Sequence, residues 1–328
     1  MIDDVFFPTP DRLDLFVCPT WSCNLRCPFC YVLGSLKGSS VGVKDPSIAF
    51  DALKDFIERH GAAYQHRTLS FGVLGGESLL NPKACLEAIM VAEDFKRAGW
   101  NVRTFVTTNL TPQLTNESIE FLKLIDNITV SIDGINHDHS RPLAPGVEYF
   151  SPLKQAITNL IELKKHGCLK KVQVQAALNE DANEELFFRM LRIIGIGSNQ
   201  ILLGRKNNTT HFRRGRTGGV RSGRTSPCCV WRYMQFFMVD AAGLHGNYYD
   251  KDGSFFGTCS VEIADLQRQY REYISEKMPA FRDPVCRACP VLTKCWGGCN
   301  GIFEDKNQPS ATCDQPEMIR ILGGDLQA

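Results

Sequence analysis

The first two thirds of the chain alternate between two hydrophobic patterns. Short apolar runs rich in β-branched residues, typical of buried strands, recur between longer segments whose apolar residues lie three and four positions apart, as in amphipathic helices. The strand-like runs are Leu13–Cys18, Leu69–Leu74, Val102–Thr107, Ile128–Ile132, Val172–Leu178 and Gln200–Gly204. The clearest helical faces consist of Ala49, Phe50, Leu53, Phe56 and Ile57, and of Leu153, Ala156, Ile157, Leu160 and Ile161.

Six strands interleaved with helices predict an α/β fold with a parallel sheet and right-handed crossovers. With six such units, we expect a partial (β/α)6 barrel, TIM-like but open at one side. Gly61, Gly99 and Gly167 each follow a helix-like segment. At these three positions the sequence predicts helix C-caps in the left-handed backbone conformation.

The alternating pattern stops near Lys206. Residues 207–226 are rich in Arg, Gly, Thr and Ser and predict a long loop, and after Pro227 periodic segments are few while cysteines resume. We therefore predict a barrel over residues 1–205, a basic bridging loop over 206–227, and a small C-terminal domain over 228–328. That domain should be held together by metal more than by an apolar core.

Length, charge and composition narrow the class of protein. The chain has 328 residues, 43% of them hydrophobic, and a formal net charge of +1. A dedicated nucleic-acid binder would carry a basic excess, so no nucleic-acid partner is expected. No apolar run reaches the roughly 18 residues of a membrane span, so no membrane association is expected. The start of the chain, Met1 to Asp4, lacks the order of a signal peptide, which predicts a cytoplasmic protein.

The chain contains 14 cysteines, an unusually high number for this class. A disulfide framework is typical of short secreted chains, whereas clustered thiols in a reducing compartment usually bind metal. Cys18, Cys85 and Cys168 lie in apolar runs or at their ends, and we interpret them as core residues. The remaining cysteines gather near the first predicted strand and in the C-terminal third.

Cys23, Cys27 and Cys30 form a C-x3-C-x2-C triplet directly after the first predicted strand. In barrel-like α/β folds, loops at the carboxyl ends of strands carry the chemistry. Zinc sites usually have four ligands in paired C-x2-C units, which three clustered thiolates fit poorly. A 4Fe–4S cubane held by three thiolates leaves one iron open for a substrate, and we predict such a cluster here.

The triplet resembles the signature of the radical SAM superfamily, C-x3-C-x-aromatic-C, with Phe29 at the aromatic position. Gly75, Gly76 and Glu77 follow the second predicted strand and resemble the family's GGE motif. The resemblance implies that the Glu77 carboxylate holds the methionine amino group of S-adenosylmethionine (SAM). Relatives usually have Pro after this motif, where this chain has Ser78.

Two further matches follow in the expected order, and the resemblance spans roughly residues 13–205. Thr108 and Asn109 resemble the family segment near the SAM ribose, and Ser131 to Gly134 resemble the S-[IL]-D-G element. Arg141 stands where many relatives have Arg. The resemblance therefore implies that Asn109, Ser131 and Arg141 contribute to SAM binding, although each of these short motifs alone is also a common turn signal.

The C-terminal cysteines resemble a SPASM domain, found in radical SAM maturases of peptides and proteins. The spacing C-x2-C-x5-C-x3-C begins at Cys286, and Cys295 to Cys299 match the C-x-G-G-C element. The resemblance implies that one auxiliary 4Fe–4S cluster is ligated by Cys286, Cys289, Cys295 and Cys313. It also implies that Cys299 reaches back to a second auxiliary cluster.

The second auxiliary cluster matches the family pattern less closely. Cys229 followed by Gly243 fits its first part, but Tyr248 stands where the next cysteine is expected. We favour Cys259 as a ligand, with Cys229 or its neighbour Cys228 as a further one. The chain is thus expected to bind three 4Fe–4S clusters, one at SAM and two auxiliary.

The resemblance implies reductive cleavage of SAM to a 5′-deoxyadenosyl radical, which takes a hydrogen atom from the substrate. The expected function is oxidative modification or crosslinking of a ribosomally made peptide side chain. The alternative is a dehydrogenase acting on a sugar or aminocyclitol, and a non-catalytic electron carrier is a third class. A carrier needs neither an open iron nor Glu77.

The expected partners are a precursor peptide, a separate leader-binding protein, and a flavodoxin or ferredoxin as electron donor. Only 22 residues precede Cys23, so we expect no leader-binding domain at the N-terminus. A basic stretch without acidic residues contains Arg205, Lys206, Arg213, Arg214, Arg216, Arg221 and Arg224. It is either a dock for an acidic peptide segment or a phosphate, or a solvated bridge between domains.

Overall fold

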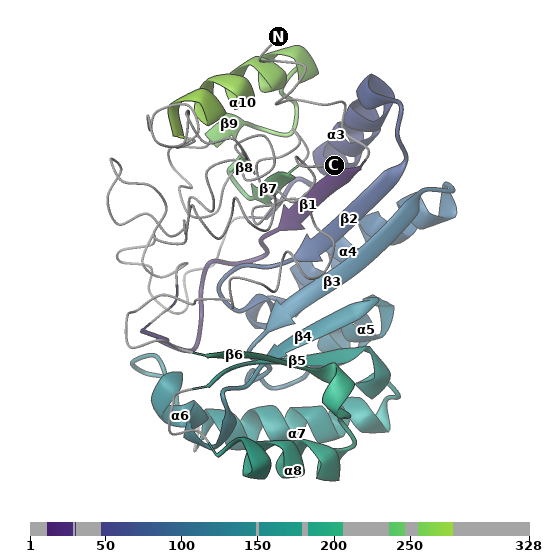
Figure 1. Ribbon diagram of the computed structural model, residues 1–328. Coiled ribbons are helices and arrows are strands. Elements are labelled where there is room, and N and C mark those ends of the chain that lie inside the picture. The colour runs from purple at the N-terminus through teal and green to yellow at the C-terminus, as the bar shows by residue number, and fades with distance from the viewer. Residues whose placement is uncertain are drawn as a thin grey trace, which may run out of the picture.

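A curved mixed sheet organises the molecule, with helices along its outer side (Figure 1). The computed structural model describes residues 12–28, 30, 47–148, 151–178, 183–205, 236–246 and 255–277. The strands are β1 (Leu13–Val17), β2 (Thr68–Val73), β3 (Asn101–Thr108), β4 (Asn127–Ser131), β5 (Val172–Leu178), β6 (Ile201–Arg205), β7 (Phe236–Asp240), β8 (Gly243–His245) and β9 (Phe255–Gly257). The α-helices are α3 (Phe50–Tyr64), α4 (Pro82–Arg97), α5 (Asn116–Leu124), α6 (His137–Ser140), α7 (Pro152–Lys165), α8 (Glu184–Ile194) and α10 (Ile263–Lys277). Short 3-10 turns are η1 (Ser78–Leu80), η2 (Gly134–Asn136), η3 (Leu169–Lys171) and η4 (Ser198–Gln200).

The strand order β6-β5-β4-β3-β2-β1-β7-β8-β9 places six consecutive strands side by side. All neighbours from β1 to β6 are parallel, with α3, α4, α5, α7 and α8 in the connections. This confirms the predicted α/β fold with a parallel-dominated sheet. Each of the six predicted strands is present within a residue of its expected bounds. All six β-strands therefore end at one edge, where the predicted site residues lie.

Strands β7, β8 and β9 extend the sheet beyond β1. Strand β7 pairs in parallel with β1, and β8 and β9 follow as antiparallel neighbours. Phe237, Leu244, Phe256 and Tyr270 belong to the same buried core as the barrel strands. Residues 236–246 and 255–277, which the sequence assigns to the second domain, thus share a sheet and core with the first. The division into three parts stays a prediction.

The helix ends agree with two of the three predicted glycine caps. Gly99 and Gly167 have positive φ angles of 85° and 71°, just beyond the ends of α4 and α7. The prediction for Gly61 is wrong, because Gly61 lies inside α3, which continues to Tyr64. A Cβ on Gly61 would lie 2.3 Å from the Trp100 ring, so close packing explains this glycine, and Gln65 ends the helix with φ 56°.

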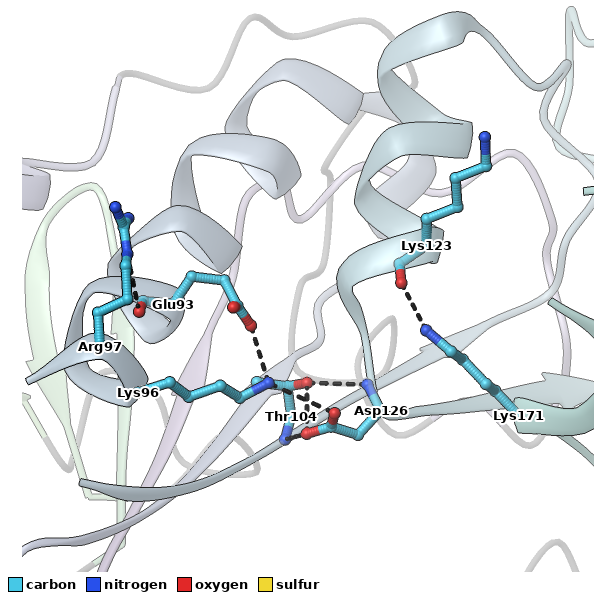
Figure 2. Close-up of polar contacts among 7 residues, drawn as sticks. All are labelled: Glu93, Lys96, Arg97, Thr104, Lys123, Asp126 and Lys171. Carbon is cyan, nitrogen blue, oxygen red and sulfur yellow. Dashed lines mark hydrogen bonds and ion pairs between the residues drawn. The ribbon is translucent and has the colours of Figure 1, made fainter. Parts of the chain in front are cut away.

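The amino-terminal end of the sheet carries a polar network between β3 and β4 (Figure 2). The Asp126 carboxylate accepts hydrogen bonds from the Thr104 amide (2.9 Å) and hydroxyl (3.0 Å), and the Asp126 amide donates to that hydroxyl (2.9 Å). Lys96 forms ion pairs with Glu93 (2.8 Å) and with Asp126 (3.4 Å). Reciprocal bonds of this kind fix the relative position of the two strands, so the network has a structural role.

Among the described residues, no helix has the length and apolar character needed to cross a bilayer.

Candidate active site

The cysteine triplet lies in a loop that leaves the carboxyl end of β1. Burial raises the pKa of the Cys23 thiol to about 12, and the negative charge of Glu77 contributes to the increase. Burial likewise raises the pKa of Cys27 to about 11, against the opposite effect of the Arg141 guanidinium. The Cys30 amide donates to the Cys27 carbonyl (3.0 Å). Phe29, the predicted aromatic position of the signature, lies outside the described residues.

These thiols fit the requirements of an iron–sulfur cluster. Cys27 and Cys30 both contribute to the raised pKa of Cys23, and all three cysteines are half-buried. Thiolates gathered there need a cationic partner, and metal binding releases their protons. In the described part of the chain, no group of three or more His, Cys, Asp or Glu side chains converges on one ion position. A cubane does not require such convergence, because each thiolate binds a different iron.

The two glycines of the GGE motif bring β2 against the cysteine loop. The Gly76 amide donates to the Thr20 carbonyl (3.0 Å), and the Glu77 amide donates to the Ser22 carbonyl (2.8 Å). A Cβ on Gly75 would lie 2.3 Å from the Thr20 oxygen, and one on Gly76 would lie 2.2 Å from the Ser22 oxygen. Only glycine permits this approach, so both residues are needed to position the loop.

Glu77 is buried beneath the loop, with only 1% of the residue exposed. Its carboxylate accepts hydrogen bonds from the Thr108 hydroxyl (2.6 Å), the Asn109 amide (2.6 Å) and the Leu79 amide (3.2 Å). Burial raises the pKa of Glu77 to about 7, and these donors partly oppose that increase. A carboxylate that is close to half ionised at neutral pH is suited to respond to a nearby positive charge.

Asn109 connects Glu77 to the first cysteine of the triplet. Its side-chain amide donates to the Asn24 side chain (3.0 Å) and points toward the Cys23 sulfur (3.9 Å). Its side-chain oxygen accepts from both the amide (2.9 Å) and the hydroxyl (2.7 Å) of Thr111. The next residue, Leu110, has a positive φ of 56°, which for a non-glycine residue indicates a turn stabilised by its surroundings. Contact of Asn109 with the SAM ribose stays a prediction.

Arg141 reaches the site from the segment after α6. It forms a two-pronged ion pair with the buried carboxylate of Asp133 (2.9 and 3.1 Å). The charge and a hydrogen bond of this guanidinium favour the ionised form of the Cys27 thiol. Ser131, the last residue of β4, is half-buried at the same edge of the sheet, and its contact with SAM stays a prediction.

Two parts of this arrangement had no signal in the sequence. The cysteine loop pairs with the segment after Arg141: Leu25 and Leu143 form an antiparallel bridge, and the Ala144 amide donates to the Asn24 carbonyl (2.9 Å). The Asn24 side chain also donates to the Thr111 hydroxyl (2.7 Å). Asn24 stands inside the cysteine triplet, yet nothing in its spacing predicts which distant residue it binds.

Comparisons with known proteins agree with this geometry. Residues 17–173 match the family model described as the Radical SAM superfamily. This segment is similar to a Radical SAM domain. It contains the cysteine triplet, the GGE motif, Asn109, Ser131 and Arg141. No curated protein matches the sequence.

Solved structures with a similar fold include two of anSMEcpe. Hexahistidine-tagged anSMEcpe with bound AdoMet has a TM-score of 0.64 and 14% sequence identity, over 96% of this chain and 98% of that one. Native anSMEcpe with bound AdoMet and the Cp18Cys peptide has a TM-score of 0.60 and 16% identity, over 96% and 98% of the two chains. At these identities the likeness demonstrates the fold alone.

Cys259 is the one predicted auxiliary ligand within the described residues. It lies after β9, outside the segment that matches the Radical SAM family model, with 5% of the residue exposed and its side chain in the apolar core. Burial raises the pKa of its thiol to about 11, and the nearby Arg59 guanidinium opposes that increase. Arg59 also donates to the Cys259 carbonyl (2.6 Å).

The remaining predicted auxiliary residues lie outside the described residues: Cys228, Cys229, Tyr248, Cys286, Cys289, Cys295, Cys299 and Cys313. The SPASM domain and both auxiliary clusters therefore stay predictions. Cys18, Cys85 and Cys168 are buried with at most 3% exposure, in agreement with their interpretation as core residues.

Proposed function

We propose that this protein is a radical SAM enzyme that oxidatively modifies or crosslinks a side chain of a ribosomally made peptide. One observation carries the proposal. Four kinds of polar group converge at the carboxyl ends of β1 to β4: the triplet thiols, the buried carboxylate of Glu77, the amide of Asn109 and the guanidinium of Arg141. They do so within a segment that matches the Radical SAM superfamily.

Cys23, Cys27 and Cys30 would hold the 4Fe–4S cluster. When bound together with SAM, such a cluster supplies the electron that splits SAM and yields a 5′-deoxyadenosyl radical. The work of the protein is then to orient SAM and to exclude water. Glu77 accepts a hydrogen bond from the methionine amino group of SAM, since a buried carboxylate forms its strongest hydrogen bonds with positively charged donors. Asn109 keeps the loop of Cys23 in place beside that carboxylate.

The peptide substrate is supported by the similarity to anSMEcpe, which binds both AdoMet and the Cp18Cys peptide in one of the structures matched. In this proposal the C-terminal cysteines would hold two auxiliary 4Fe–4S clusters, which would supply an acceptor for the electron lost by the substrate. The partners are a precursor peptide with a separate leader-binding protein, and an electron donor of the flavodoxin or ferredoxin type. The basic stretch from Arg205 to Arg224 is the proposed dock for an acidic segment of the peptide.

The radical chemistry can be tested first without a substrate. The full chain, reconstituted anaerobically with iron and sulfide, is incubated with SAM and dithionite, and 5′-deoxyadenosine is measured by mass spectrometry. Replacement of Cys23, Cys27 and Cys30 by Ala should abolish that product and leave auxiliary iron in place. Cys168→Ala is the matched control, because this buried thiol lies away from the triplet and should not alter the product. Undiminished cleavage of SAM by the triple variant would refute the proposal.

The substrate class requires a second assay. Short peptides encoded beside the gene, and separately aminocyclitols and sugars, are incubated with the active enzyme and analysed by mass. Loss of two hydrogen atoms from a peptide, dependent on SAM, is the expected result. The same loss from an aminocyclitol or sugar, with the peptides unchanged, would favour the dehydrogenase instead.

A further inference from the structure

A buried carboxylate links the cysteine loop to the far end of the chain. One oxygen of Asp240 accepts a hydrogen bond from the Trp21 indole (2.9 Å). The other lies 3.0 Å from the His245 ring nitrogen and accepts from the amides of Ala242 (2.8 Å) and Gly243 (3.2 Å). Asp240 and His245 are 5% and 2% exposed, respectively. A carboxyl group so deeply buried is tolerated because it has several hydrogen-bond donors.

The Trp21 contact is not needed for the turn between β7 and β8. That turn uses the oxygen facing Ala242 and Gly243, as in an ordinary Asx turn. The second oxygen of Asp240 instead reaches across the sheet to a residue more than 200 positions earlier. This bond fixes the orientation of the Trp21 ring, since the indole has a single N–H donor.

The Trp21 ring stands next to the cluster-binding cysteines. It forms a small apolar cluster with Cys18 and Met238, separate from the main core, and Cys30 packs against this cluster. The Cys18 amide donates to the Val239 carbonyl (2.8 Å), so the loop begins where β7 ends. The hairpin of β7 and β8 therefore supports the side of the loop on which Cys30 lies.

We propose that Asp240 is a positioning residue that holds the Trp21 ring as an apolar wall beside Cys30 and thereby keeps the cluster in its site. This inference rests on the proposed function, because it assumes a cluster at Cys23, Cys27 and Cys30. It assigns to the β7–β8 hairpin a role in the first cluster site, which the family motifs place wholly before residue 174. The neighbouring apolar surface matters because exclusion of water protects an iron–sulfur cluster from exchange of its ligands.

Two substitutions separate this role from simple support of the hairpin. In Asp240→Asn the side-chain oxygen can still accept the hydrogen bonds from the Ala242 and Gly243 amides. The side-chain NH2 group then faces the Trp21 N–H, and two donors cannot form a hydrogen bond with each other. Trp21→Phe keeps an aromatic ring and removes only the donor. Asp126→Asn is the matched control, because Asp126 also binds a backbone amide and a side-chain donor (Figure 2). Asp126 directly precedes β4, at the amino-terminal end of that strand, whereas the cysteine loop leaves the carboxyl end of β1.

The reconstituted full-length variants are exposed to a ferrous chelator, and the loss of the SAM-dependent EPR signal of the reduced cluster is followed with time. Loss should be about tenfold faster in Asp240→Asn and in Trp21→Phe than in wild type, as expected for one hydrogen bond to a charged acceptor. The double variant should lose the signal no faster than the faster single variant, because both remove the same bond. Asp126→Asn should match wild type.

A second readout uses the iron-free chain. Exchange of the Trp21 indole N–H with deuterated water, observed by NMR, should be slow in wild type and about tenfold faster in Asp240→Asn. Cluster loss at the wild-type rate in both Asp240→Asn and Trp21→Phe would overturn the proposal. If Asp240→Asn does not fold, the rate of cluster loss in Trp21→Phe alone decides whether the proposal holds. Failure of the proposed function would give a different result, since the wild-type protein itself would then show no SAM-dependent EPR signal.

Discussion

Glu77 offers the sharpest test of the site, because its charge affects SAM binding and protein stability in opposite directions. The residue is almost fully buried, and burial raises the pKa of its carboxyl from 4.5 to about 7. Three donors, the Thr108 hydroxyl and the Asn109 and Leu79 amides, hold it in place. Glu77→Gln keeps the shape of the side chain and removes its charge.

The expected loss of SAM affinity follows from the strength of one charge-assisted hydrogen bond. Such a bond contributes about 1.5–3 kcal/mol, so Kd for SAM should rise by roughly 10- to 100-fold in Glu77→Gln at about pH 8. Isothermal calorimetry on the reconstituted protein measures this directly. Since the ionised carboxylate is the binding form, the ratio of the two Kd values should shrink toward about pH 6, where Glu77 is mostly protonated.

Stability should depend on pH in the opposite sense. Because the pKa of Glu77 is higher in the folded protein than in the unfolded chain, its contribution to stability is fully present below about pH 4.5. That contribution is lost as the pH rises through about 7, and the full difference is about 3 kcal/mol at roughly 1.4 kcal/mol per pKa unit. Urea unfolding of the SAM-free protein should show this decrease in wild type, and Glu77→Gln should lack it.

Both results are needed, and each can refute the reasoning. Absolute stabilities do not enter the comparison, because the amide of the Gln side chain faces the Asn109 N–H and lowers stability at every pH. An unchanged Kd for SAM in Glu77→Gln would show that Glu77 does not bind the SAM amino group. Identical pH slopes in the two proteins would show that Glu77 does not titrate near neutral pH.

Three further substitutions, and one control, test separate parts of the molecule. Gly76→Ala places a Cβ 2.2 Å from the Ser22 carbonyl oxygen and should therefore prevent iron binding at the triplet. Gly99→Ala is its control, because a Cβ there meets no neighbouring atom and is strained only by the φ of 85°. This control should lower the free energy of unfolding in urea by about 1 kcal/mol and leave the iron content unchanged. Cys259→Ala should lower total iron from about twelve to about eight per chain if every predicted cluster is a cubane, and unchanged iron would remove Cys259 from the ligands. Ser78→Ala should be neutral or stabilising in urea unfolding, because the buried Ser78 hydroxyl has no hydrogen-bond partner among the described residues; a loss above about 1 kcal/mol would contradict this.

The parallel strands could be predicted because each carries apolar residues on a fully buried face and is bounded by turn residues. Val172–Leu178 has the bounds expected from its apolar run. Strands β7, β8 and β9 were not predicted. They are three to five residues long, and β8 consists only of Gly243, Leu244 and His245. So short a segment has too few positions to establish a period, and its position depends on pairing with β1 far away in sequence.

The candidate site was predictable where a motif directly follows a strand. Cys23, Glu77 and Asn109 were proposed from their resemblance to family motifs, and each lies just beyond β1, β2 or β3, whose ends gather at one edge of the sheet. The side chains that hold these residues in place belong to no motif that could be recognised in the sequence. Asn24 and Asp240 are short polar residues that a sequence pattern assigns to turns, and their partners are decided by tertiary proximity.

In its described residues, 18–28 and 30, the cysteine loop contains no helix or strand, so its shape depends on neighbours that successive strands provide. Gly76 contacts it from the end of β2, Asn109 from the end of β3, Leu143 from the segment after β4, and Asp240 from the end of β7. Because the sheet order places β7 beside β1, the loop is held from both sides rather than from the β2 side alone. A substitution in the β7–β8 hairpin can therefore disturb the triplet without any contact with SAM, and the site is a property of the whole parallel edge rather than of its motif.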